Sequence, residues 1–243
     1  MAEHTHVLIR KLNALHAISA EEQKALLESL DPSRTVAKGR DIVADGSEPG
    51  VSTVILSGVA CRYKALADGR RQILVFQFPG DVVDLYSYVL KKMDHAVGAM
   101  TTCEIATIPH RKVEALCRTF PNLAYTLWRD SLIDTAILNM AVVNNGSRKA
   151  DERIAHLICE QFVRLAAVGL AKRGQPSSFY ITQTDIAEAT GLSLVHVNKT
   201  LRKLKDQGLI GRNPQQLEIL DWHALSALAG FDPQYLHYTT MPA

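Results

Sequence analysis

The chain has 243 residues, which favours two domains, and its 47% hydrophobic and 21% charged residues are typical of a globular protein with buried cores. No stretch approaches the roughly 18 consecutive apolar residues of a membrane-spanning helix, and no apolar signal region opens the chain, so we expect a cytoplasmic protein without a membrane partner. The net charge of +2 excludes a general polycation.

The cysteines are scattered along the chain, with no CxxC pair and no Cys–His cluster at the spacing of metal ligands. Disulfide frameworks and zinc ribbons are therefore not expected, and we predict no metal site. Gly-rich phosphate loops, HExxH and GxSxG sequences are also missing, so an enzyme is not expected and no catalytic residue is assigned. The four cysteines, interpreted as reduced thiols, are Cys61, Cys103, Cys117 and Cys159.

Two short helices are predicted at the start of the chain. Apolar residues recur at helical spacing over residues 7–15. Ser19 and Glu22 then form the pattern of a capping box, which opens a second helix over Glu21–Leu30. Asp31-Pro32 ends that helix.

The character changes over residues 35–110, where short β-branched or aromatic runs alternate with glycine turns. Asp68-Gly69 is a strong hairpin signal between two of these runs. Turns about every ten residues favour an antiparallel roll or barrel over a parallel sheet. The predicted strands are Asp41–Val43, Thr53–Leu56, Ala60–Leu66, Arg71–Phe78 and Cys103–Pro109.

Helical periodicity returns from about Pro121 and includes apolar residues at a/d spacing. We predict a dimer seam along this helix, the alternative being a helix packed within its own domain. Asn144–Arg148 reads as a hinge. The expected domain boundaries give an N-terminal domain over 1–120, a dimerisation helix and hinge over 121–146, and a C-terminal domain over 147–243. The predicted seam residues are Ile133, Ala136, Ile137, Met140 and Val143.

The segment "ITQTDIAEATGLSLVHVNKTLRKLKDQGLI", residues 181–210, has the pattern of a helix-turn-helix. Thr182-x-x-Asp185 is a capping box for a short helix. Gly191 provides a sharp turn, and Ser193 caps a second helix to about residue 207. "LIGRNPQQLEIL" then reads as two short strands around Asn213-Pro214, which predicts a winged helix-turn-helix.

Cations are concentrated on this second helix although the segment from Asp151 onward is neutral, with nine Lys/Arg and nine Asp/Glu. Within Lys199–Arg212 five cations face one anion, Asp206. The start of the helix should enter the major groove, where Asn198 and Lys199 can bond base edges and Val195 can touch a thymine methyl group. The predicted DNA-binding residues are Thr182, Gln183, Thr184, Ser193, Leu194, Val195, His196, Asn198, Lys199, Arg202, Lys203, Lys205 and Arg212.

The chain resembles the Crp/Fnr family of bacterial transcription regulators over nearly its whole length. The resemblance rests on "KGRDIVADG", "VILSGVACRYKALADGRRQILVFQFPGD" and "TTCEIATIPH" in the N-terminal half and on the helix-turn-helix segment. It implies an α+β fold: an N-terminal antiparallel β-roll (a double-stranded β-helix like that of cyclic-nucleotide-binding domains), a long dimerisation helix at about Asn122–Asn145, and a C-terminal winged helix-turn-helix. It also implies a homodimer that binds an inverted repeat in double-stranded DNA and contacts RNA polymerase.

The chain departs from the family where an effector would bind. Cyclic-AMP-binding members have a Gly-Glu after the "PGD" turn and an Arg-Ser/Thr pair for the phosphate; here Asp84 is the closest acid and His95-Ala96 replaces the pair. We therefore expect no cyclic AMP response and no cofactor. The first cysteine is Cys61, which disfavours an iron–sulfur cluster. Haem, for which Cys103, His95 and His110 are the candidate ligands, is not expected. Any effector pocket would be lined by Arg62, Arg71, Val82, Val83, Asp84, Leu85, Tyr86, His95 and Ala96.

The recognition helix also lacks the glutamate that better-known members place near its start, which removes an acceptor for cytosine N4. The preferred half-site should therefore differ from the family's commonest one. The leading interpretation is a DNA-binding regulator, with or without modulation by an effector other than cyclic AMP. Two alternatives stay open. One is a sensor module that acts through protein contacts, and the other is a cyclic-nucleotide-responsive regulator with a variant pocket.

Overall fold

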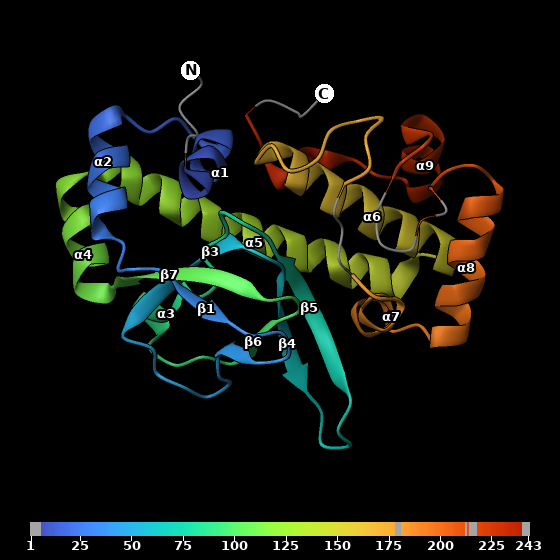
Figure 1. Cartoon of the computed structure of the whole chain (residues 1–243), viewed down its shortest axis with the longest axis horizontal. Helices are drawn as coiled ribbons and strands as arrows, with labels where there is room; N and C mark the ends of the chain where they lie inside the picture. Colours follow the sequence, from blue (N-terminus) through green and yellow to red (C-terminus); the bar gives the residue numbers. More distant parts are fainter. Residues whose placement is uncertain (1–5, 178–180, 212, 214–217, 240–243) are drawn as a thin grey trace. The chain divides into compact units, whose positions relative to one another are not determined.

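A computed structural model describes residues 6–177, 181–211, 213 and 218–239 (Figure 1). The chain forms two compact units. The first comprises Met1–Lys64 and Val75–Thr135, and the second comprises Ala65–Leu74 and Ala136–Ala243. This division differs from the boundaries expected at residues 120 and 146, because it falls inside the long central helix and assigns a hairpin tip to the second unit.

The first unit begins with helices α1 (Val7–Leu15) and α2 (Ala20–Ser29). The predicted capping box of α2 is present. The Glu22 backbone N–H donates to Ser19 Oγ at 3.2 Å, and the Ser19 N–H donates to Glu22 Oε2 at 2.6 Å. Two of the N–H groups that a helix start leaves unpaired are thereby satisfied.

The strands of the roll form two sheets (Figure 1). One has the order β1-β7-β3 and the other the order β2-β6-β4-β5, and the pairings β1–β7, β3–β7, β2–β6 and β4–β6 are antiparallel. The strand bounds are β1 Arg34–Val36, β2 Asp41–Val43, β3 Val51–Ser57, β4 Ala60–Ala65, β5 Arg71–Gln77, β6 Ala96–Ala99 and β7 Cys103–Pro109. All five predicted strands are present, and the antiparallel roll is confirmed.

The core of the roll takes apolar side chains from both sheets. Ile55 of β3, Val97 of β6 and Ile105 of β7 are completely buried. A second cluster joins α1 and α2 to the two helices that follow the roll, α4 (His110–Thr119) and α5 (Pro121–Ser147). The roll thus has a filled apolar interior, and the second cluster packs the helices against Val54 of β3 and Ile108 of β7.

Gly80, in the turn after β5, permits close approach of α1. It has φ of +97°, and a Cβ atom there would lie 2.9 Å from Lys11 Cβ and 3.0 Å from the carbonyl oxygen of Val7. Any other residue would be strained in this conformation and would push α1 away. Glycine at this turn therefore brings α1 within reach of the charged groups that follow β5.

The long helix α5 continues through the predicted hinge. Asn144–Ser147 are helical, and the break comes at Arg148, before α6 (Ala150–Ala167). Asn144 is buried, and its side chain lies 2.9 Å from Nδ1 of the buried His156 on α6. Burial, followed by the charge of Arg148, lowers the pKa of His156 to about 3, so its ring is neutral. This buried contact explains why a polar, glycine-containing sequence stays helical here.

The second unit contains the predicted helix-turn-helix, formed by α7 (Gln183–Thr190) and α8 (Leu194–Asp206). Gly191 between them is left-handed, with φ of 66°. Helix α9 (Trp222–Ala229) and a 3₁₀ turn over Pro233–Leu236 follow. No helix in the described part of the chain is both long enough and apolar enough to span a bilayer.

The predicted wing is described in part. Ile210 and Ile219 form an antiparallel bridge, and the Gly211 N–H donates to the Glu218 carbonyl at 2.8 Å. Of the predicted turn, Pro214 lies outside the described residues, as does Arg212. The described strand pairing is therefore short. It joins residues 210–211, which follow α8, to residues 218–219.

Candidate functional site

The start of α7 is fixed by its cap. Thr182 and Asp185 form a reciprocal capping box: the Asp185 N–H donates to Thr182 Oγ1 at 3.2 Å, and the Thr182 N–H donates to Asp185 Oδ2 at 2.9 Å. Thr182, Gln183 and Thr184 are exposed. Helix starts present N–H groups and a positive dipole end to anions, so these residues are suited to contact a phosphate.

Helix α8 buries one face and exposes the other. Val197 and Leu204 are completely buried and hold the helix against its own unit. Ser193 caps the helix, with the His196 N–H donating to Ser193 Oγ at 3.3 Å and His196 Nδ1 lying 2.9 Å from the same oxygen. At the exposed start of the helix, Leu194 and Val195 are 47% and 76% exposed. Such exposure of two aliphatic residues gives this end of the helix an apolar tip.

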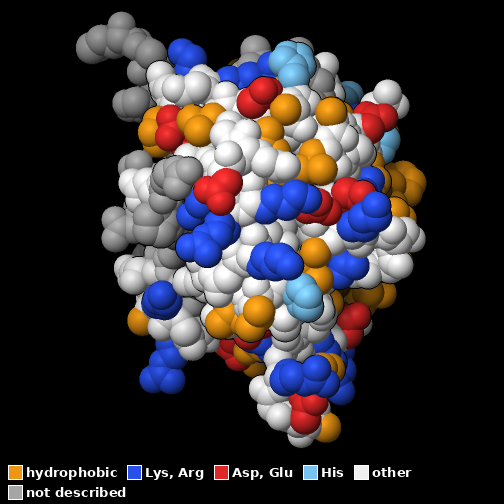
Figure 2. Space-filling view, turned by 90° about the vertical axis from the view of Figure 1, so that its right-hand side faces the viewer, with side chains coloured by type: hydrophobic (Ala, Val, Ile, Leu, Met, Phe, Trp, Pro, Cys, Tyr) orange, Lys and Arg blue, Asp and Glu red, His pale blue; other side chains and the backbone are white. Residues whose placement is uncertain are grey.

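The cations of α8 follow this tip. Asn198, Lys199 and Arg202 are exposed, and the side of the molecule that carries α8 shows several Lys and Arg side chains among hydrophobic and neutral ones (Figure 2). A hollow of about 530 Å³ lies beside the helix. It is lined by Gln183, Asn198, Lys199, Leu201, Arg202, Lys205 and Asp206. The hollow joins the start of α7 to the basic face of α8, so a polyanion could contact both.

Lys203 is placed differently from its basic neighbours. Its ammonium group forms an ion pair with Asp151 of α6, at 2.5 Å. This pairing lowers the pKa of Asp151, so the carboxylate stays charged. Lys203 was predicted as a DNA contact of the same kind as Lys205, but the structure gives it a counter-charge within the protein. Asp151 itself was not singled out in the sequence, because nothing in the spacing links it to a residue 52 positions later.

Arg71 was predicted to line an effector pocket, and the structure places it elsewhere. Its guanidinium pairs with Glu188 and, at 3.1 Å, with Asp185, both on α7. Gln72 Nε2 donates to the Glu188 carbonyl at 2.7 Å. These contacts lie within the second unit, so Arg71 belongs with the helix-turn-helix and not with the interior of the roll.

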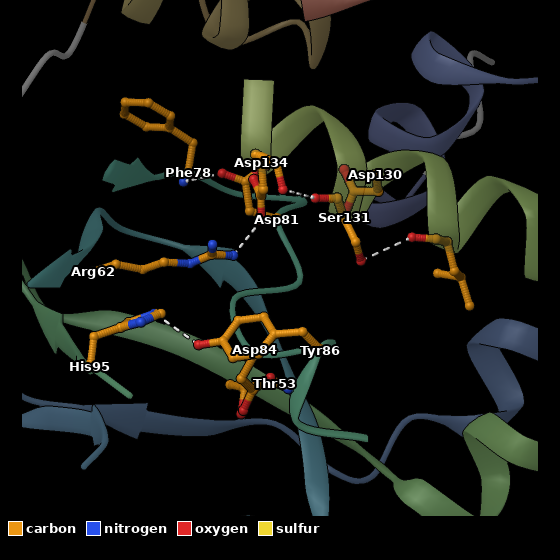
Figure 3. Close-up of polar contacts among 12 residues, drawn as sticks. Thr53, Arg62, Phe78, Asp81, Asp84, Tyr86, His95, Asp130, Ser131 and Asp134 are labelled. Atoms are coloured by element: carbon orange, nitrogen blue, oxygen red, sulfur yellow. Dashed lines mark hydrogen bonds and ion pairs between the residues drawn. The ribbon is translucent and has the colours of Figure 1, made fainter. Parts of the chain in front are cut away.

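Arg62 does point into the first unit, but it meets a protein carboxylate there (Figure 3). It is 3% exposed and forms an ion pair with Asp134 of α5. Burial opposes the charge of the guanidinium, yet Asp134, with Tyr86 and Asp81, raises the pKa of Arg62 above its ordinary value. The one cation of the predicted pocket that lies inside the roll therefore already has a counter-ion.

A second buried cation lies nearby. Lys11 of α1 pairs with Asp81 at 2.6 Å and with Asp130 of α5 at 3.3 Å. Asp130 and Asp134 are one helical turn apart on α5 (Figure 3). Lys11 and Arg62 therefore bind the same face of this helix. The sequence carried a signal for this cluster, namely two carboxylates at i and i+4 on a predicted helix, and the sequence prediction missed it.

Asp84, the closest acid after the "PGD" turn, is completely buried. It accepts hydrogen bonds from the backbone N–H and the hydroxyl of Thr53 on β3. Burial raises the pKa of Asp84 to about 6 despite these bonds. Val82 and Val83 are buried beside it, and the Val83 N–H donates to the Thr53 carbonyl at 2.9 Å. The segment after the "PGD" turn is thus fastened to β3.

His95 is buried and hydrogen-bonded on both ring nitrogens, and Figure 3 shows the contact with Tyr86. Nε2 lies 2.8 Å from the hydroxyl of the half-buried Tyr86, and Nδ1 lies 2.7 Å from Asp94. Burial, followed by the nearby charge of Arg62, lowers the pKa of His95, which favours the neutral ring. Its neighbour Ala96 is buried in β6, and Leu85 is half-buried. A neutral, fully bonded His95 is a poor substitute for a phosphate-binding arginine.

The exposed face of α5 differs from the predicted seam. Ile133 and Ile137 are 5% and 4% exposed, so they are already buried within one chain, and Ala136 and Met140 are half-buried. Only Val143 of the predicted set is exposed. The large hydrophobic side chains that α5 exposes are Tyr125, Trp128, Leu132, Val142 and Val143. The chain itself therefore covers four of the five predicted seam residues at least in part, because a helix with apolar residues on two faces does not reveal which one its own chain covers.

The thiols and histidines that the structure describes are not arranged as a metal centre. Among the described residues, no group of three or more His, Cys, Asp or Glu side chains is placed to hold a metal ion. Cys61, Cys103 and Cys159 are buried, and burial raises the pKa of Cys103 and, to about 12, that of Cys159. His110, half-buried, has Nε2 3.3 Å from the Ser87 hydroxyl. Buried thiols with raised pKa values are unreactive.

Comparison with known proteins agrees with this architecture. Residues 33–120 match the cyclic nucleotide-binding domain, and residues 152–228 match the Crp-like helix-turn-helix domain. The nitrogen fixation regulation protein FixK of Bradyrhizobium diazoefficiens is 30% identical over 176 residues, 72% of each chain. The transcriptional activatory protein AadR of Rhodopseudomonas palustris is 30% identical over 184 residues, again 72% of each chain. The chain belongs to the Crp/Fnr family of transcription regulators.

The likeness extends over most of the chain. The transcriptional activator protein anr of Pseudomonas aeruginosa is 24% identical over 214 residues, 88% of this chain and 87% of its own. Among solved structures, FixK2 from Bradyrhizobium japonicum superposes with a TM-score of 0.73 at 23% identity, covering 81% of this chain and 96% of its own. A CooA mutant from Carboxydothermus hydrogenoformans superposes with a TM-score of 0.67 at 17% identity, covering 91% and 95%. These superpositions support the fold, and the relatives support a DNA-binding transcription regulator that is not an enzyme.

Proposed function

We propose that the protein is a homodimeric regulator that reads an inverted repeat in double-stranded DNA and does not respond to cyclic AMP. The observation that carries the proposal is the exposed face of α8, where an apolar tip is followed by Asn198, Lys199 and Arg202. Asn can bond adenine through two hydrogen bonds, Lys can donate to guanine, and aliphatic side chains can contact thymine methyl groups.

Phosphate contacts would flank these base contacts. The exposed start of α7 offers N–H groups, Gln183 and Thr184, and Lys205 lines the hollow beside α8. Phosphate contacts fix the orientation of a reading helix without specifying sequence. Arg202, one turn beyond Asn198, lies between the residues proposed to contact bases and those proposed to contact phosphates.

Homodimer formation is proposed through the exposed stripe of α5, which we define as Tyr125, Trp128, Leu132, Thr135, Asn139 and Val142. The hydrophobic members are 48%, 64%, 55% and 72% exposed, in chain order. They follow the 3–4 spacing of a two-stranded coiled coil. Exposed aromatic and aliphatic side chains in one line are characteristic of a protein interface. Two copies joined in parallel along α5 would present two α8 helices at the same end.

The proposed lack of a cyclic AMP response rests on the interior of the roll. The guanidinium of Arg62 is neutralised by Asp134, and His95 is held neutral by burial. The Asp84 carboxyl group already accepts two hydrogen bonds from Thr53. A cyclic phosphate needs an arginine fork or free backbone amides, and a ribose needs a free acceptor. Binding would require breaking a buried ion pair.

Selection of binding sites from a randomised DNA duplex tests the proposal. We expect enrichment of an inverted repeat whose half-sites lie about 10 base pairs apart, one helical turn. Lys199→Ala should cost about 1–3 kcal/mol on the selected site and relax the preference at one base pair. Equal binding of selected and random DNA at all salt concentrations would instead favour a sensor that acts through protein contacts.

A further inference from the structure

The exposed stripe of α5 has two polar positions, the fourth and fifth of its six residues. In a heptad frame that begins with Tyr125 at position a, Trp128 is at d, Leu132 at a, Thr135 at d, Asn139 at a and Val142 at d. Thr135 and Asn139 are both exposed. Apolar residues would be expected at all six positions if the stripe served only to hold two helices together.

The two polar residues differ in how their hydrogen-bonding groups are used. The hydroxyl of Thr135 donates to the Ser131 carbonyl at 3.3 Å, so it is satisfied within its own helix. The side-chain amide of Asn139 has no hydrogen-bond partner among the described residues. Thr135 can therefore be covered by an apolar surface with little penalty, but Asn139 cannot, since a buried amide without a partner loses its hydration.

From this difference we infer that Asn139 sets the register of the dimer by pairing with the partner's Asn139. The inference rests on the homodimer proposed above. In a parallel, in-register pair of helices, each a position faces its own copy across the two-fold axis. An amide has both a donor and an acceptor, so two asparagine side chains can bond each other.

A shifted dimer would leave Asn139 unpaired. A slip of one heptad would move one chain about 10 Å along the helix axis. It would set Asn139 against Leu132 or Gly146, neither of which has a side-chain group that can bond an amide. Because the two reading helices must match two half-sites, such a slip would also destroy the symmetry that an inverted repeat requires. Asn139 thus selects the one register that is useful on DNA.

Charge variants at position 139 test the inference on the full-length protein. Asn139→Asp and Asn139→Lys would each place like charges opposite one another, and each should raise the dimer dissociation constant at least about tenfold. An equimolar mixture of the two, distinguished by a mass tag on one chain, should restore dimers, nearly all of them heterodimers. Sedimentation velocity at low salt measures all three samples.

Asn145 provides the matched control. It is an exposed asparagine on the same helix, outside the a and d positions, and its amide donates to the Ala189 carbonyl at 3.2 Å. Asn145→Asp and Asn145→Lys should dimerise as the wild type does and should show no preference for heterodimers. Asn139→Val should dimerise more tightly than the wild type but lose affinity for the selected inverted repeat, because register is no longer enforced.

The outcomes separate this inference from the proposed dimer. If the wild type dimerises while both charged variants at 139 and their mixture behave like it, Asn139 does not face its copy and the inference is overturned, although the dimer stands. If the wild type is monomeric with and without the inverted repeat, the proposed dimer and the inference both fail. Preferential heterodimers at 139, and not at 145, support the pairing.

Discussion

Arg62 of β4 and Asp134 of α5 form an ion pair in the first unit, with their side chains 3% and 17% exposed. Beside it, Lys11 pairs with Asp81 and Asp130. Each pair joins an element of the first unit to α5 or to the turn after β5. A buried charge contributes to stability only while its partner remains, because the cost of removing it from water is large.

Asp134→Asn should therefore destabilise the protein by about 3 kcal/mol, since it leaves the Arg62 guanidinium buried without a counter-charge. Urea unfolding followed by circular dichroism measures the change. Asp68→Asn is the control, because Asp68 pairs with Arg70 at an exposed hairpin tip, and it should leave the unfolding midpoint unchanged. A double variant, Arg62→Met with Asp134→Leu, should recover most of the loss. Equal midpoints for Asp134→Asn and the wild type would show that the pair is not buried in solution.

The stability of the first unit should depend on pH through Asp84. Its folded-state pKa of about 6 lies above the ordinary value of 3.8 because the carboxyl is buried. The folded state then binds more protons than the unfolded state between these values, so this contribution is fully present below about pH 4 and is lost as pH rises through 6. Asp84→Asn, which keeps an acceptor for the Thr53 N–H, should gain about 2 kcal/mol relative to the wild type at pH 8.

The measurement for Asp84 is the unfolding free energy from pH 4.5 to 8 for both proteins. The difference between them should grow with pH and level off above about pH 7, where the wild-type carboxyl is ionised. A constant difference across this range would mean that Asp84 titrates near its ordinary pKa, and that the two hydrogen bonds from Thr53 balance the effect of its burial.

The two faces of α5 should respond differently to a charge. Leu132 is 55% exposed and Ile133 is 5% exposed. Leu132→Glu should raise the dimer dissociation constant more than about tenfold without lowering monomer stability, because a carboxylate would be desolvated only on association. Ile133→Glu should lower the stability of the fold itself by about 3 kcal/mol or more. Light scattering and urea unfolding on both variants distinguish the two effects, and a dimeric Leu132→Glu protein would contradict the proposed stripe.

The elements with strong local signals were predicted correctly. Capping boxes at Ser19 and Thr182, the hairpin at Asp68-Gly69 and the glycine turn at Gly191 each depend on residues close in sequence, and each is present. β6 was missed because Ala96–Ala99 has few β-branched residues and depends on pairing with distant strands. Whether such a segment forms a strand depends on its pairing with distant strands, which no local sequence pattern encodes.

The candidate sites show the same limit. The exposed residues of α8 follow from helix periodicity once the buried face is recognised, so the predicted readers lie on one surface. The counter-ions could not be predicted in this way, since Lys203–Asp151 and Arg62–Asp134 join residues 52 and 72 positions apart. Which face of α5 stays exposed likewise depends on what the rest of the chain covers. Long-range contacts therefore changed the roles given to individual charged residues, while the family and the fold remained as predicted.

Cyclic AMP should not bind the roll measurably. The phosphate would have to displace Asp134 from Arg62, and it would find His95 neutral. Isothermal titration calorimetry on the full chain should show no saturable binding tighter than about 10 μM, or some −7 kcal/mol. Asp134→Asn offers a comparison, because it frees Arg62 to accept an anion. Saturable binding by the wild type would instead support a nucleotide-responsive regulator with a variant pocket.

Lys205 and Lys203 should differ in their contribution to DNA binding, although both are cations near the end of α8. Lys205 lines the hollow between the basic face of α8 and the start of α7, whereas Lys203 is paired with Asp151. A lysine that neutralises a phosphate releases a condensed counterion, so Lys205→Ala should lower the slope of log K against log salt by about 0.9 on cognate and random DNA alike. Lys203→Ala should change the slope by less than half as much, because its charge is already compensated.

Asp151→Asn frees the charge of Lys203 and should make the slope steeper. This gain should vanish in the Asp151→Asn, Lys203→Ala double variant. Binding isotherms from 50 to 200 mM salt on both DNAs measure every slope. Equal losses for Lys203→Ala and Lys205→Ala would show that DNA draws Lys203 away from Asp151, and the ion pair would then belong to the free protein only.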